Sequence, residues 1–215
     1  MKSETVTIIV TFLILFHLRK RVPMTKFAFK SLFAASVFAL VASASAFAAD
    51  TYKLDANHTS VTFQYTHFGF SHPTGKFMNA VGSVTLDDAT PANSSVEVSF
   101  DINGINTGVA ALDTHLKSAD FFDAAKFPTA TFKSTQVELT GENTANVTGD
   151  LTVHGITQST VLAVTFNKKA FNPALFKTGY GFSATAHLSR KAFGLGNLEP
   201  IVGDDIDLII DAEVY

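Results

Sequence analysis

The C-terminal segment Asp205–Val214 reads DIDLIIDAEV and alternates apolar with charged side chains almost without interruption. Ile206, Leu208 and Ile210 fall on one face of this segment, and its acidic residues fall on the other. A period of two is typical of a β-strand that buries one face. The segment Val96–Ile102, VEVSFDI, repeats the pattern, so both segments are predicted to be strands.

The same alternation recurs along the rest of the chain. Turn-rich pieces such as 87–93 and 141–143 separate the apolar runs, and no regular helices stand between them. Short connections of this kind favour an antiparallel sandwich or barrel over a parallel sheet. With the two segments above, the pattern predicts an all-β, eight-stranded antiparallel up-and-down barrel. The further predicted strands contain residues 61–65, 82–86, 129–139, 147–153, 162–166 and 180–188.

One segment, residues 109–126, departs from the period of two. Leu112 and Leu116 are four residues apart, and Asp113 precedes Lys117 by four, a spacing that favours an ion pair on a helix. The sequence therefore predicts one short helical segment around 109–126, with the adjacent aromatics 121–122 as a plug.

The N-terminal region has the pattern of an export signal. Residues 24–48 combine two lysines, an apolar run and small residues that end in Ala46-Phe47-Ala48. This order is typical of a secretory signal peptide cleaved after Ala48. Residues 1–23 are interpreted as an untranslated upstream extension, with a two-part leader or an uncleaved anchor as alternatives. The remainder, 50–215, is predicted to be one domain, exported to the periplasm.

The composition excludes several classes of protein. The chain has no cysteine, so disulfides, Cys-ligated metals and thiol catalysis are ruled out. Of its 16 basic and 19 acidic residues, the first 48 positions hold six and one, which leaves a net charge of −8 from Ala49 onward. An acidic chain lacks the basic surface that nucleic-acid binding requires.

Several motifs resemble one known family, the YceI-like, polyisoprenoid-binding proteins. The resemblance covers almost all of the chain after the signal segment, from Tyr52 to Val214. Its longest part is the central segment 113–123, DTHLKSADFFD, which lies in the expected order between the other motifs. The remaining parts are YKLD at 52–55, HTSVTF at 58–63 with His67, KFP at 126–128, TFKS at 131–134, GDLTVHG at 149–155, SRKAFG at 189–194 and VGDD at 202–205.

The resemblance implies a lipocalin-like barrel in the periplasm that holds a long isoprenoid or similar amphiphilic lipid in its lumen. It further implies a homodimer, no catalysis and no cofactor other than the bound lipid. A carrier of this kind is expected to make transient contact with a membrane or a membrane protein. An apolar lipid needs a long, dry pocket more than it needs directional contacts.

The alternation and the resemblance together give candidate site residues. Small side chains at Gly149, Ala184 and Ala186 leave room in the lumen. His115, Lys117 and Arg190 are the candidates for contact with a polar headgroup. The predicted lumen residues are Phe63, Tyr65, Phe77, Phe100, Phe132, Leu151, Phe166, Phe182, Ala184 and Ala186, with Phe121 and Phe122 near the mouth.

The same residues also bear on alternative functions. Six histidines remain after the signal segment, but there is no H-E-x-x-H motif, so turn and barrel-end contacts are favoured over a metal site. His115 with Ser118 or Ser183 lacks the nucleophile elbow of a hydrolase. Two other classes stay open: an enzyme acting on a lipid or quinone, and a stress-linked periplasmic protein whose barrel is packed solid.

Overall fold

In the computed structural model the described residues are 49–215, and they belong to one compact unit. The predicted signal segment 24–48 and the extension 1–23 lie outside the described residues. Among the described helices, none has the length and apolar character needed to cross a bilayer. The strands are β1 (Asp50–Lys53), β2 (Ser60–His67), β3 (Thr74–Phe77), β4 (Val81–Leu86), β5 (Ser95–Asp101), β6 (Ile105–Asn106), β7 (Thr129–Leu139), β8 (Thr144–Val153), β9 (Ile156–Asn172), β10 (Lys177–Ser189) and β11 (Val202–Val214), and the helices are α1 (Ala110–Lys117), η1 (Pro91–Asn93), η2 (Ile102–Gly104) and η3 (Arg190–Phe193).

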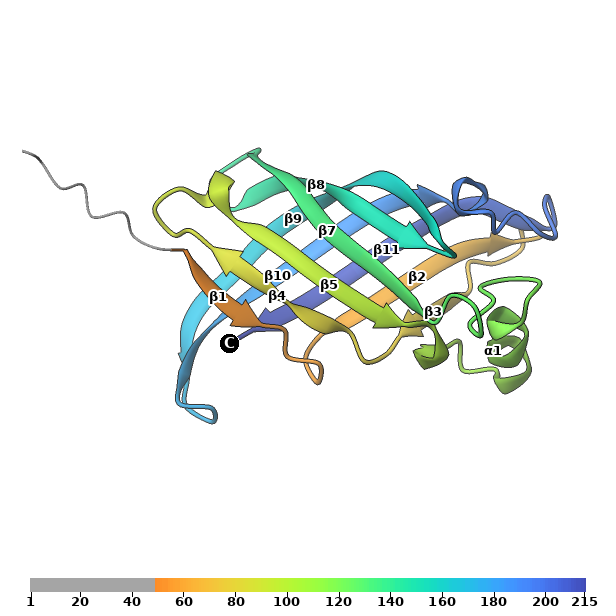
Figure 1. Ribbon diagram of the computed structural model, residues 1–215, viewed down its shortest axis with the longest axis horizontal. Coiled ribbons are helices and arrows are strands. Elements are labelled where there is room, and N and C mark those ends of the chain that lie inside the picture. The colour runs from red at the N-terminus through yellow and green to blue at the C-terminus, as the bar shows by residue number, and fades with distance from the viewer. Residues whose placement is uncertain (1–48) are drawn as a thin grey trace, which may run out of the picture. The chain divides into compact units, whose positions relative to one another are not determined.

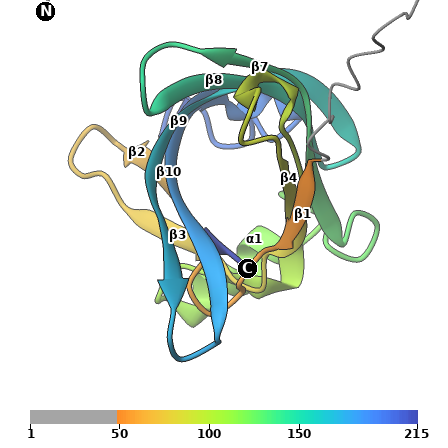
Figure 2. The same ribbon diagram turned by 90° about the vertical axis from the view of Figure 1, so that its left-hand side faces the viewer.

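All strand pairs are antiparallel, and the sheet curls into a barrel around a central lumen (Figures 1 and 2). β11 pairs with β10 on one side and with β2 on the other. β1 pairs with β4, and Leu54 directly after β1 bridges to Val214 at the end of β11. The predicted all-β antiparallel barrel is therefore confirmed.

The predicted strand count of eight was wrong, because the barrel contains eleven strands. The three additional strands, β1, β3 and β6, have four, four and two residues, too short to show a clear alternation. β1 and β2 form one interrupted strand beside β11, through the Leu54–Val214 bridge and the β2–β11 pairing. β3 and β4 form a second interrupted strand, and β5 and β6 form a third. The eleven strands thus occupy eight positions around the barrel, three of them filled by a broken strand.

The helical segment is shorter than the predicted 109–126, since α1 ends at Lys117. Ser118 is extended and its Oγ donates a hydrogen bond to the His115 carbonyl oxygen at 2.7 Å, which stops the helix. Asp113 does not pair with Lys117 as predicted. Its carboxylate instead accepts hydrogen bonds from the backbone N–H and the hydroxyl of Thr107, at 2.7 and 2.6 Å, and ties the start of α1 to the preceding loop.

Two β-bulges change which side chains face the lumen. In β7 the register shifts at Thr135, and Val137 and Leu139 beyond it line the lumen together with Phe132 before it. In β9 the shift falls at Asn167, so that Lys169, and not Lys168, is on the inner face. A bulge adds one unpaired residue and so reverses the alternation beyond it.

Small residues provide space for aromatic rings in the wall. A Cβ atom on Gly149 would lie 2.5 Å from the ring of Phe132, and one on Gly75 would lie 2.3 Å from the ring of Phe63. Gly149 was predicted to leave the lumen open, but the Phe132 ring takes that space. Phe132 is 3 % exposed and packs with Val147 and Leu151 in the largest buried cluster.

Candidate functional site

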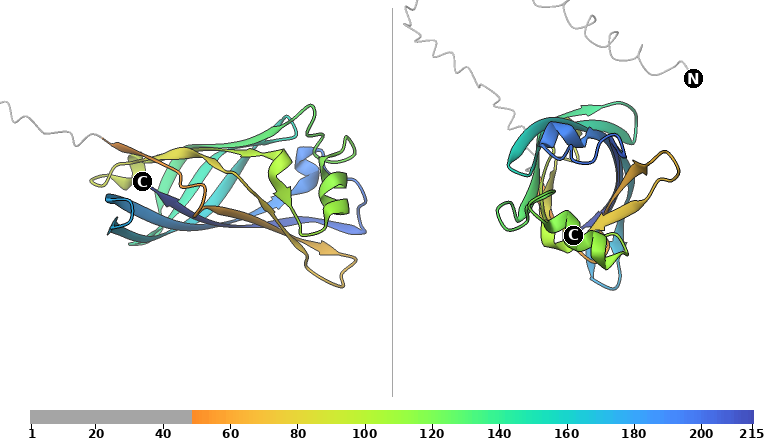
Figure 3. Two further views of the ribbon diagram at one scale, coloured as in Figure 1. Left: turned by 90° about the horizontal axis from the view of Figure 1, so that it is seen from below. Right: turned by 90° about the vertical axis from the view of Figure 1, so that its right-hand side faces the viewer.

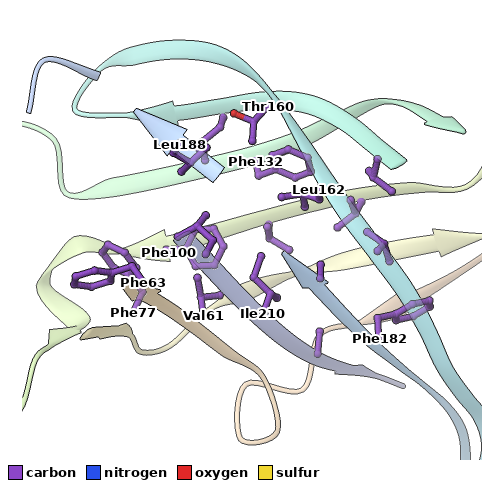
Figure 4. Close-up of a pocket in the computed structure, with 18 of the residues that line it drawn as sticks. Val61, Phe63, Phe77, Phe100, Phe132, Thr160, Leu162, Phe182, Leu188 and Ile210 are labelled. Atoms are coloured by element: carbon purple, nitrogen blue, oxygen red, sulfur yellow. The ribbon is translucent and has the colours of Figure 1, made fainter. Parts of the chain in front are cut away.

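The inward faces of the strands surround a cavity of about 1150 Å³. This is above the range of roughly 300–1,000 Å³ that is common for pockets that bind small molecules. Most of its wall is made of Val, Leu, Ile and Phe side chains, and Figure 4 shows several of them pointing into the space. A barrel packed solid with side chains would have no such cavity, so the packed-barrel alternative is wrong.

The cavity runs between the two ends of the barrel. At one end of the barrel, called the helix end, lies α1 (Figure 3). Leu112 and Leu116 of α1 belong to the cavity wall. At the other, called the hairpin end, the wall includes residues from the β4–β5 loop (87–94), the β7–β8 turn (140–143) and β9 just before its hairpin with β10. The two ends lie at the right and left of Figure 1.

The structure places eleven of the twelve predicted lumen residues on the cavity wall. Ala186 is the exception. It pairs with Leu208 and lies two residues before Leu188, and these larger neighbours form the cavity surface there. The eleven are Phe63, Tyr65, Phe77, Phe100, Phe121, Phe122, Phe132, Leu151, Phe166, Phe182 and Ala184.

The three headgroup candidates differ in position. His115 reaches the cavity wall at the helix end, where its ring meets that of Phe121 edge-on at 4.8 Å. Lys117 does not line the cavity. Arg190 lines it, but its guanidinium is already bonded to the protein.

Arg190 is 7 % exposed and organises the loop before β11. Its Nε donates to the Gly203 carbonyl at 2.8 Å, and one Nη donates to that of Val202 at 2.7 Å. The other Nη donates to the carbonyls of Asn197, at 2.8 Å, and Leu195. With four carbonyl acceptors engaged, the guanidinium holds the loop rather than presenting free donors to a ligand.

A polar cluster that the sequence did not predict lies at the hairpin end. It consists of Asp88, Lys169, Tyr180 and Tyr52, and the first three line the cavity. Lys169 Nζ is 2.5 Å from Asp88 Oδ2 and 4.9 Å above the ring of Tyr180. The Tyr180 hydroxyl donates to Asp88 Oδ2 at 3.2 Å and lies 3.3 Å from the Tyr52 hydroxyl.

The protonation states of the polar cluster follow from these contacts. The hydrogen bond from Lys169 lowers the pKa of Asp88, and the same bond raises the pKa of Lys169. The hydrogen bond with Tyr180, together with burial, raises the pKa of Tyr52 to about 12. At neutral pH the cluster therefore holds one carboxylate, one ammonium group and a protonated Tyr52 hydroxyl.

One group of possible metal ligands occurs among the described residues. The ligand atoms of Asp55, His58 and Glu213 lie within 4.8 Å of one another, outside the cavity wall. Asp55 Oδ2 is bonded to His58 Nδ1 at 2.9 Å, and Glu213 accepts from the Tyr215 hydroxyl at 2.5 Å. The hydrogen bond to Asp55 raises the pKa of His58. The three side chains thus make hydrogen bonds to protein groups. His58 was predicted to make a turn contact, and its partner Asp55 is three residues before it.

Comparison with known proteins identifies the family. The model of the YceI-like domain matches residues 52–214, which is most of the chain and all but a few of the described residues. The chain belongs to the YceI-like family. The resemblance inferred from the motifs of the sequence is therefore confirmed.

Curated relatives and solved structures agree with this assignment. UPF0312 proteins are similar over most of their length: that of Pseudomonas savastanoi pv. phaseolicola is 39 % identical over 81 % of this chain and 91 % of its own, and that of Azotobacter vinelandii is 37 % identical over the same shares. The YCEI protein of Campylobacter jejuni is 28 % identical, with a TM-score of 0.63 over 70 % of this chain and 89 % of its own. BcnA of Burkholderia cenocepacia, 24 % identical with a TM-score of 0.69 over 75 % and 99 %, shares the fold.

Proposed function

We propose that this YceI-like protein is a carrier that holds a long isoprenoid or similar amphiphilic lipid in the barrel lumen, without catalysis. The observation that carries the proposal is the apolar cavity of about 1150 Å³ between the two ends of the barrel. A domain of Saccharophagus degradans with the same fold, at a TM-score of 0.58 and 14 % identity over 76 % of this chain and 97 % of that one, is described as polyisoprenoid-binding.

The energetics of such binding are simple. Each Å² of apolar lipid surface that leaves water contributes roughly 25 cal/mol, and the Phe, Val and Leu side chains of the wall add dispersion contacts. A chain as apolar as an isoprenoid needs few hydrogen bonds along its length. The wall offers few, because its charged side chains stand at the two ends.

The proposal of binding without catalysis is supported by the positions of the His–Asp pairs. In the described part of the chain, the His58–Asp55 and His187–Asp207 hydrogen bonds both lie outside the cavity wall. Two serines of the wall are bonded to other groups: the Ser183 hydroxyl donates to Asp211 at 2.7 Å, and the Ser94 hydroxyl oxygen accepts from the backbone N–H of Asp87.

Binding can be measured directly on protein from which lipid has been extracted. A long polyprenol added at 100 times its dissociation constant is expected to stabilise the protein by about 2.7 kcal/mol. For a domain of this size the melting temperature then rises by about 5–11 °C. A saturated hydrocarbon too short to fill the cavity is the control. An unchanged melting temperature with every long amphiphile tested would contradict the proposal.

We further propose export to the periplasm, on the basis of the signal pattern at 24–48. Protein recovered from the periplasmic fraction is expected to begin at Ala49. Its intact mass decides the matter, because a chain that still contains residues 27–48 would show that the segment is not removed. The homodimer and the membrane contact implied by the family resemblance stay predictions.

A further inference from the structure

The cavity has two chemically different ends, and the difference bears on how a lipid would lie in it. At the helix end the wall is largely apolar, with Val109, Leu112 and Phe121 among its residues. Arg190 is the one Lys or Arg there among the described wall residues, and its donors are taken up by carbonyl oxygens. His115 also lines this end, so an imidazole is available to a ligand there, whereas no free Lys or Arg side chain lines it in the described part of the chain.

The hairpin end is polar. The polar cluster places the Lys169 ammonium, the Asp88 carboxylate and the Tyr180 hydroxyl at the cavity wall, with the ammonium and the hydroxyl each within hydrogen-bond distance of the carboxylate. Asn143 also lines this end, and its carbonyl accepts from the backbone N–H of Phe166, three residues before Lys169 on β9. A group at this position has both hydrogen-bond donors and acceptors around it.

The charges of the hairpin end are unbalanced. Asp87, Asp88 and Glu142 line the cavity there, against the single ammonium of Lys169. Since Asp88 already neutralises Lys169, the remaining charge is negative. An anionic group placed there would face like charges.

We propose that the polar head of the bound lipid lies at the hairpin end, against Asp88, Lys169 and Tyr180, and that it is an uncharged oxygen group and not a phosphate. This inference rests on the proposed carrier function. A neutral hydroxyl or carbonyl oxygen accepts a hydrogen bond from Lys169 or Tyr180, and a hydroxyl also donates to a carboxylate. The apolar chain then extends past Phe182 toward the helix end.

The test compares two probes on lipid-free protein: a polyprenol and its monophosphate with the same chain length. The alcohol is expected to bind at least about tenfold more tightly. Changing Glu142→Gln removes one negative charge and keeps Asp87, whose carboxylate accepts from the backbone N–H groups of Ala89 and Thr90 in the loop that carries Asp88. This variant is expected to tighten binding of the phosphate several-fold and to leave binding of the alcohol nearly unchanged.

A second comparison locates the head. Lys169→Met is expected to weaken binding of the alcohol several-fold, because a donor is lost and Asp88 is left unpaired. Lys168→Met is the matched control, since Lys168 is the adjacent lysine in β9, is exposed and does not line the cavity. It is expected to bind both probes as the unmodified protein does.

The outcomes separate the two proposals. Equal or tighter binding of the phosphate by the unmodified protein would overturn the assignment of a neutral head and leave the carrier function standing. Equal effects of Lys169→Met and Lys168→Met would overturn the location of the head. If neither probe binds, the carrier function itself fails and this inference fails with it.

Discussion

Replacing Ala184 with tryptophan is expected to remove most of the bound lipid while the lipid-free barrel stays folded. Ala184 is 8 % exposed, lines the cavity and lies between Val164 and Ile210 on the neighbouring strands, which line it too. An indole at this position enters the space that the lipid chain is proposed to occupy. We expect lipid content to fall at least about tenfold, because the indole fills part of the cavity that the lipid chain needs.

The adjacent residue offers a matched control, because Thr185 is exposed on the outer face of β10. Thr185→Trp is expected to keep its lipid. Lipid content and melting temperature are measured on native and on extracted samples of both variants, since bound ligand itself raises stability. In a packed core the added volume would cost about 1–3 kcal/mol, so a strong loss of stability of lipid-free Ala184→Trp would contradict an open cavity. Full lipid content in this variant would show that the lipid binds elsewhere.

Arg190→Met is expected to destabilise the protein strongly. The substitution leaves the carbonyl oxygens of four loop residues without their donor, and each buried, unpaired acceptor costs about 1–3 kcal/mol. Because the loop can relax toward water, we expect a total of about 3–5 kcal/mol and a melting temperature lower by about 6–20 °C. Thermal unfolding of lipid-free protein measures the effect.

Two further variants make this result specific. Arg190→Lys has donors in a different geometry and is expected to lose nearly as much stability as Arg190→Met. Lys191→Met, the neighbouring residue, breaks an exposed pair with Glu199 and is expected to change stability by less than about 1 kcal/mol. If Arg190→Met loses lipid but keeps its stability, Arg190 is a headgroup contact and not the anchor of the loop.

Alternation of apolar residues was sufficient to predict the barrel and most of its lumen. In segments such as Val96–Phe100 and Ile206–Ala212 every second side chain reaches the cavity wall, because a strand with one buried face has no other arrangement. The short strands β1, β3 and β6 were missed for the opposite reason. Two to four residues define no period, and their pairing depends on long-range contacts, such as that between Leu54 and Val214.

The polar parts of the site could not be predicted from the same pattern. Lys169 faces the cavity only because of the bulge at Asn167, and no local signal in the sequence marks that bulge. Strict alternation would have placed Lys168 inside instead. Arg190 was predicted as a headgroup contact; it lines the cavity, but its carbonyl partners come from the loop 195–203, whose path depends on the folded barrel.

Mass spectrometry of an organic extract from natively purified protein tests the carrier function most directly. We expect a long amphiphilic lipid of isoprenoid type, at close to one molecule per chain, which is depleted in Ala184→Trp and retained in Thr185→Trp. The expected headgroup is uncharged, with an oxygen that reaches Lys169 and Tyr180. An extract that contains no lipid above the level of a control protein purified in parallel, with the cavity intact and the protein folded, would contradict the account.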